Sequence, residues 1–144
     1  MEYNYSVTQD FWIIFKQGNG AWFQRFLRQG FGHCFVLTHD SYNWIVLDPH
    51  RLKLVFTIPP YQLTENVPRM MVYEGFRVVK ITTFDRATYK TGGHSPFSNC
   101  VSFVKYCLGI KLFCFTPYGL YKSLLRLSSK NQSRKGIRKV QLII

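Results

Sequence analysis

The sequence predicts an α+β fold, in which an antiparallel sheet packs against helices, one of them beginning at Cys100. Short runs rich in β-branched and aromatic residues, separated by turn residues, recur between residues 11 and 83. Two helical patterns with their own start signals follow between residues 98 and 127. The chain has 144 residues, of which 47% are hydrophobic, so it has material for one buried core.

Five segments read as strands. Residues 11–15 (FWIIF) run into a turn cluster, and residues 33–38 and 44–48 are joined by a loop that suits an antiparallel hairpin. Pro49 is expected to end the second hairpin strand. The two further expected strands are residues 52–58 and 77–83 (RVVKITT).

A first helix is expected over residues 21–28, because Trp22, Phe23, Phe26 and Leu27 share helical spacing and would face the core. Glycines after it would stop the helix and lead the chain to His33.

A second helix should begin near Ser98 or Asn99, since both are favoured N-cap residues, and end at Gly109. It follows a loop over residues 85–99 that is rich in Gly, Ser, Thr and Pro. On this helix Cys100 shares the face that points toward the body of the protein.

A third helix is signalled by Thr116 followed by Pro117, an N-cap and a proline at the first helical position. Its leucine stripe ends at residue 127. We therefore expect one domain over residues 1–127 and a basic C-terminal tail over residues 128–144. The last five residues (VQLII) are apolar and could add a strand to a sheet.

Positive charge is concentrated in the second half of the chain. Residues 1–85 hold eight Lys/Arg and seven Asp/Glu, whereas residues 86–144 hold eleven Lys/Arg and no acid. Such a surface would attract nucleic acid, anionic lipid or an acidic protein, and residues 105–139 are the candidate contact region. A generally basic protein without such a partner is an equally good interpretation.

The four cysteines, Cys34, Cys100, Cys107 and Cys114, are too few for a disulfide scaffold and match no zinc-ligand spacing. We expect reduced thiols, most of them small buried side chains, and neither a metal nor a cofactor.

Cys100 is the candidate nucleophile. A cysteine in the first turn of a helix feels the positive end of the helix dipole, and the unpaired N–H groups there stabilise a thiolate or an oxyanion. From spacing alone, a buried structural cysteine at a helix start is the commoner case.

His33 and Asp48 are the candidate base and its orienting acid. In an antiparallel hairpin the end of one strand lies beside the start of the other, so Asp48 can reach His33. Taken separately, a histidine at a strand start is more often structural, and Asp48-Pro49 more often starts a turn.

Other residues are weaker candidates. Cys34 could replace Cys100 as nucleophile, but it lacks a helix N-terminus, and strand alternation turns it away from His33. The remaining histidines, His39, His50 and His94, have no companion at metal-ligand spacing and are expected at the surface. Trp44 is expected in the core.

The run GHCFVL at residues 32–37 and the later run WIVLDP at residues 44–49 resemble the His and Asp strands of transglutaminase-like and other papain-like enzymes. Residues 98–104 (SNCVSFV) look like the nucleophile helix of that superfamily. In the usual order this helix precedes the strands. Here it follows them, as in permuted groups such as the lecithin:retinol acyltransferase-like enzymes. The resemblance implies a circularly permuted papain-like fold with Cys100, His33 and Asp48 as catalytic residues.

Residues 20–127 are also similar to a group of small proteins encoded by tailed bacteriophages, through the set GFGHCF, WxxxDP, NCVxFVK, LGI and TPxxL. This second resemblance implies no activity. It leaves open a non-catalytic role in the virion or in assembly.

Two functions follow as expectations. The first is a cysteine-dependent acyl-transfer enzyme that acts on a peptide, amide or ester. The second is a non-catalytic phage virion or adaptor protein whose basic surface contacts DNA or other virion proteins. A pure nucleic-acid-binding module is weaker, since no recognition motif is visible. Without a secretory signal or a membrane-spanning stretch, we expect the host cytoplasm or the virion as its location.

Overall fold

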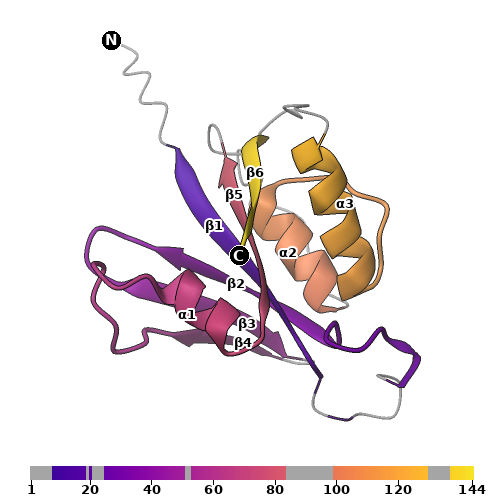
Figure 1. Ribbon diagram of the computed structural model, residues 1–144, viewed down its shortest axis with the longest axis horizontal. Coiled ribbons are helices and arrows are strands. Elements are labelled where there is room, and N and C mark those ends of the chain that lie inside the picture. The colour runs from indigo at the N-terminus through magenta and orange to yellow at the C-terminus, as the bar shows by residue number, and fades with distance from the viewer. Residues whose placement is uncertain (1–7, 19, 21–24, 51–52, 84–98, 130–136) are drawn as a thin grey trace.

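The computed structural model describes residues 8–18, 20, 25–50, 53–83, 99–129 and 137–144 (Figure 1). These residues form an α+β fold, which confirms the predicted class. In chain order the elements are β1 (Gln9–Lys16), β2 (His33–His39), β3 (Trp44–His50), β4 (Lys53–Thr57), α1 (Val67–Tyr73), β5 (Arg77–Thr83), α2 (Cys100–Leu108), α3 (Pro117–Ser129) and β6 (Ile137–Ile143).

The six strands form one antiparallel sheet in the order β4-β3-β2-β1-β5-β6. The central strand β1 is buried on both faces, which explains its continuous apolar sequence. Its alternate side chains enter two different cores: Ile13 and Phe15 lie in one, and Trp12 and Ile14 in the other.

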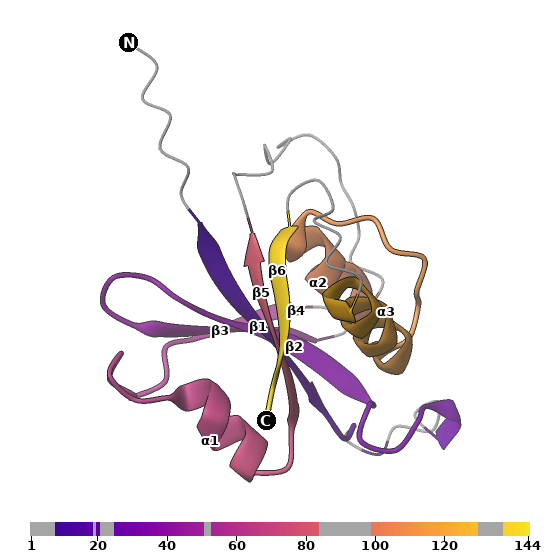
Figure 2. The ribbon, with the colours of Figure 1, turned by 45° about the horizontal axis from the view of Figure 1, so that its top comes forward.

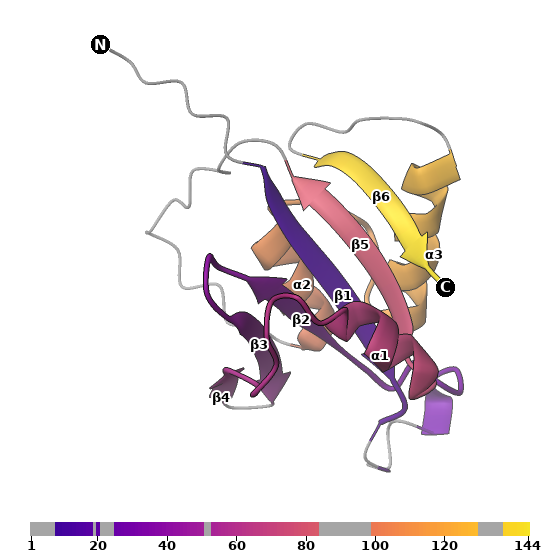
Figure 3. The same cartoon turned by 60° about the vertical axis from the view of Figure 1, so that its left-hand side comes forward.

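The helices cover opposite faces of the sheet. Figure 3 shows α1 in front of the strands and α2 and α3 behind them, and the same separation is visible in Figure 2. The core under α2 and α3 contains Val104, Leu120 and Leu124, all fully buried. The core on the α1 face includes Trp44 and Val67. The expected position of Trp44 in the core is therefore confirmed.

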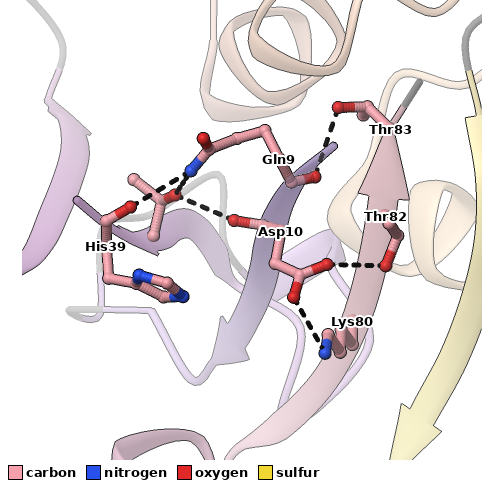
Figure 4. A network of polar contacts seen from close by, with 7 residues as sticks. Gln9, Asp10, His39, Lys80, Thr82 and Thr83 are labelled. Carbon is pink, nitrogen blue, oxygen red and sulfur yellow. Dashed lines mark hydrogen bonds and ion pairs between the residues drawn. The ribbon is translucent and has the colours of Figure 1, made fainter. Parts of the chain in front are cut away.

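Polar side-chain contacts link β1 to both of its neighbouring strands, β2 and β5 (Figure 4). The Thr82 hydroxyl donates to Asp10 Oδ1 at 2.6 Å, and Lys80 Nζ lies 3.0 Å from Asp10 Oδ2. On the other side, Gln9 Nε2 donates to the Thr38 hydroxyl at 2.8 Å. Partial burial raises the pKa of Asp10, but the contacts with Thr82 and Lys80 outweigh it and hold the pKa below its usual value.

The third helix begins as predicted. Gly119 N–H donates to the Thr116 hydroxyl at 3.1 Å, which makes Thr116 the N-cap and places Pro117 in the first turn. The leucine stripe also lies where expected, with Leu120 and Leu124 fully buried.

The sequence did not predict α1. It is only seven residues long, and Asn66 caps it by accepting a hydrogen bond from the Arg69 N–H at 3.2 Å. Pro68 lies in its first turn, where a proline is compatible with a helix. Asn66 and Pro68 together were the signal that could have revealed it.

The helix predicted over residues 21–28 is wrong in the part that can be compared. Residues 25–26 form a short 3₁₀ turn, and residues 21–24 lie outside the described residues. The side chain of Phe26 is 83% exposed and belongs to neither core, so its helical spacing was coincidental.

Pro49 does not end the hairpin strand, because β3 continues to His50. Pro49 pairs with Leu54 of β4, whereas the pairing of β3 with β2 runs only from Trp44 to Leu47. Pro49 therefore lies beyond the β2 ladder, in the part of β3 that pairs with the edge strand β4 alone.

Residue 127, where the sequence predicts the end of the domain and the start of a tail, lies within α3. The third helix extends to Ser129, and β6 pairs with β5 along the edge of the sheet. The apolar end of the chain thus adds a strand to its own sheet. None of the helices among the described residues has the length and apolar sequence of a membrane-spanning segment.

Candidate active site

His33 and Asp48 meet at one end of the β2–β3 hairpin. His33 is the first residue of β2, Asp48 lies near the end of β3, and the two strands are antiparallel. His33 Nε2 is 2.5 Å from Asp48 Oδ1, and both side chains are largely buried, with 18% and 17% exposed. The hairpin geometry expected from the sequence therefore brings this pair together.

The first turn of α2 presents Cys100 at a capped helix N-terminus. Asn99 has an extended backbone, and its side chain accepts a hydrogen bond from the Ser102 N–H at 2.8 Å. In return the Ser102 hydroxyl accepts from the Asn99 N–H at 3.2 Å, which completes a capping box. The N–H groups of Cys100 and Val101 point out of the helix end, because the first residues of a helix have no intrahelical acceptor.

The side chain of Cys100 interacts with two residues of β2. Hydrogen bonding with the Cys34 side chain is the largest influence on its pKa, and hydrogen bonding with His33 and with the Cys34 backbone acts in the same direction. These contacts outweigh burial and lower the pKa of Cys100 to about 5. The sulfur is therefore a thiolate at neutral pH.

His33 has the complementary shift. Burial lowers its pKa, but hydrogen bonding with Asp48 and with Cys100 outweighs this and raises the pKa of His33 to about 9. At neutral pH the pair is an imidazolium beside a thiolate.

Asp48 remains ionised. Burial raises its pKa, whereas the hydrogen bond and charge of His33 hold it below the usual value, helped by Lys16 and His50. We refer to Cys100, His33 and Asp48 as the Cys-His-Asp group.

Two residues, Cys34 and His50, have contacts in this site that the sequence did not predict. Strand alternation placed Cys34 away from His33, and Cys34 does belong to the core under α2. Cys100 lies at the start of α2 and so reaches Cys34 as well as His33. His50 was expected to be a plain surface residue. Its side chain is 51% exposed, but Nε2 lies 3.6 Å from Asp48 Oδ2.

The other sequence candidates lie elsewhere. His39 is at the far end of β2, where its ring contacts those of Trp12 and Trp44. His94 lies outside the described residues. The thiol of Cys107 is half-buried, and burial raises its pKa to about 12, which is the behaviour of an unreactive core cysteine.

No cluster of three or more His, Cys, Asp or Glu that could hold a metal ion occurs among the described residues. Comparisons with protein-family models, with curated proteins and with solved structures give no match. A function for the chain must therefore be inferred from its own residues.

Proposed function

We propose that the chain is a cysteine-dependent acyl-transfer enzyme, a peptidase, amidase or acyltransferase, built on a circularly permuted papain-like arrangement. Cys100 is the nucleophile, His33 carries the proton and Asp48 orients His33. The observation that supports this most is the contact of a thiol at a capped helix N-terminus with a histidine that is itself held 2.5 Å from a carboxylate.

In the proposed reaction, the Cys100 thiolate attacks the carbonyl carbon of an amide or ester. The oxyanion that forms would accept hydrogen bonds from N–H groups at the start of α2. Protonated His33 gives its proton to the departing amine or alcohol, which leaves an acyl group on Cys100. Neutral His33 then takes a proton from water, or from an acceptor amine or alcohol, and the attack of that acceptor releases Cys100.

The pKa shifts set the pH range of this reaction. Below about pH 5 the Cys100 thiolate is protonated, and above about pH 9 His33 loses the proton that the leaving group needs. The acyl-transfer rate is therefore expected to follow a bell-shaped pH profile. Its two limbs report apparent pKa values that belong to the coupled Cys100–His33 pair.

An acylation burst with p-nitrophenyl acetate tests the proposal without knowledge of the natural substrate. We expect stoichiometric release of p-nitrophenolate and an acetyl group on Cys100, found by peptide mapping. Cys100→Ala should abolish the burst. Asp48→Asn should slow it by about tenfold or more, because His33 loses the carboxylate that orients its ring and keeps it protonated. His39→Ala, at the other end of β2, is the matched control. A burst that persists in Cys100→Ala would refute the proposed nucleophile.

A second candidate function, favoured by the charge distribution, is binding to DNA or to an acidic virion surface. Exposed cations of the acid-free half include Lys111, Lys122, Arg126 and Lys139. Lys105 is engaged internally, since its Nζ donates to the backbone oxygens of Leu112 and Cys114.

Fluorescence anisotropy with duplex DNA tests this second function. If several lysines and arginines contact phosphates, affinity should fall by about two or more orders of magnitude between ~50 and ~200 mM salt. The double variant Lys122→Gln, Arg126→Gln should bind more weakly and show a smaller salt slope, whereas Cys100→Ala should bind normally. Salt-independent binding, or none, would exclude this candidate.

A further inference from the structure

Cys34 and Cys100 bring two thiols together from distant parts of the chain. Cys34 lies in β2 and Cys100 starts α2, and hydrogen bonding between their side chains shifts the pKa of both. Both side chains pack in the core under α2 and α3. Each is a free thiol in the structure.

Cys34 and Cys100 differ in solvent exposure and in protonation state. Cys34 is fully buried, and its pKa lies well above the usual value because of Cys100 and burial, so it stays a protonated thiol. Cys100 is only partly buried and is the ionised member. An oxidant from solution therefore reaches the reactive sulfur of Cys100 first, and the buried Cys34 thiol is its hydrogen-bonding partner.

We propose that Cys34 and Cys100 form a reversible redox pair, in which a hydroperoxide oxidises Cys100 and Cys34 then closes a disulfide with it. This rests on the reactive Cys100 of the proposed function and adds a means of switching that site off. Cys34 would thus protect the nucleophile from irreversible oxidation.

The chemistry balances in two steps. The Cys100 thiolate attacks one oxygen of the hydroperoxide, a sulfur–oxygen bond forms, the O–O bond breaks, and the alkoxide leaves as an alcohol after taking a proton from the His33 imidazolium. Cys34 then attacks the sulfur of the Cys100 sulfenic acid, a sulfur–sulfur bond forms, and the hydroxyl leaves with the Cys34 proton as water. Two thiols are oxidised, and one hydroperoxide is reduced to alcohol and water.

The test treats the full chain with one equivalent of hydrogen peroxide, traps sulfenic acid with dimedone, and maps the peptides by mass spectrometry. We expect a Cys34–Cys100 disulfide, loss of Cys100 labelling by iodoacetamide, and full recovery with dithiothreitol. In Cys34→Ala, Cys100 should instead carry the dimedone adduct. In a parallel sample without dimedone and with excess peroxide, it should proceed to sulfinic acid and not recover with dithiothreitol. Cys107→Ala, which removes the half-buried thiol of α2, is the matched control and should behave as the wild type.

Each outcome separates this inference from the proposed function. A dimedone adduct on wild-type Cys100 without a disulfide, or a disulfide of Cys100 with another cysteine, overturns the pairing and leaves the acyl-transfer proposal standing. A Cys34–Cys100 disulfide in a protein that shows no acylation burst supports the pair and overturns the proposed enzyme. If Cys34→Ala does not fold, as judged by circular dichroism, Cys34→Ser provides the same readout.

Discussion

Alkylation of Cys100 by iodoacetamide is expected to titrate with a midpoint near pH 5, in contrast to the value of about 8.5 for an ordinary thiol. The physical reason is the stabilisation of the thiolate by Cys34 and by the His33 imidazolium. The rate should rise up to about pH 6 and then stay level, whereas an ordinary thiol continues to gain about tenfold per pH unit up to its own pKa.

A rate at pH 7 alone would not reveal this difference. A thiolate of lower pKa is intrinsically less nucleophilic, with a Brønsted coefficient of about 0.4–0.5, and this nearly cancels the gain in thiolate fraction at neutral pH. At pH 5 the cancellation is incomplete, and Cys100 should react about 30- to 60-fold faster than an ordinary thiol.

His33→Ala is the decisive variant in this experiment. Removing the imidazolium should move the Cys100 midpoint upward, and the Cys34 contact that remains should keep it below the ordinary value. His39→Ala should leave the midpoint unchanged. A wild-type midpoint at pH 8 or above would contradict the thiolate–imidazolium pair, and an unchanged midpoint in His33→Ala would remove His33 from it.

Phe15→Ala is expected to lower the free energy of unfolding by about 3–5 kcal/mol. Phe15 is fully buried, and its ring packs against Phe31 at 5.8 Å and Tyr121 at 5.4 Å between centroids. It therefore joins the central strand to α3. The large side chain leaves a cavity in a close-packed core that can collapse only in part.

Urea unfolding followed by circular dichroism measures this loss. Phe26→Ala is the matched control, because a side chain that is 83% exposed should change stability by no more than about 0.5 kcal/mol. If Phe15→Ala is unfolded without denaturant, Phe15→Leu should still fold, with a loss of about 1.5 kcal/mol or less. A loss below about 1 kcal/mol in Phe15→Ala would show that the core around β1 is not packed as described.

Local signals in the sequence were sufficient for most of the elements. The strand predicted over residues 77–83 has the bounds of β5, and Asn99 and Gly109 delimit α2 as expected. β5 has a strong strand composition and α2 has explicit caps, so the formation of these elements depends little on tertiary contacts. The expected helix over residues 21–28 lacked such a cap and rested on spacing alone.

The candidate site was predictable only in part, for a physical reason. His33 and Asp48 lie on one hairpin, so strand geometry alone brings them together. The approach of Cys34 to Cys100 depends on where the start of α2 rests against β2, and no local pattern encodes this. The catalytic roles of Cys100, His33 and Asp48 remain predictions.

The low pKa of Cys100 depends on a contact between segments that are far apart in the sequence, and this gives the thiol a use as a probe of folding. When most buried cysteines unfold, they become more reactive because reagents reach them. Cys100 should become less reactive on unfolding at pH 5. Unfolding separates it from Cys34 and His33, so its pKa rises and the thiolate is protonated. Loss of alkylation at Cys100 together with its gain at Cys34 would therefore report the opening of the contact between α2 and β2.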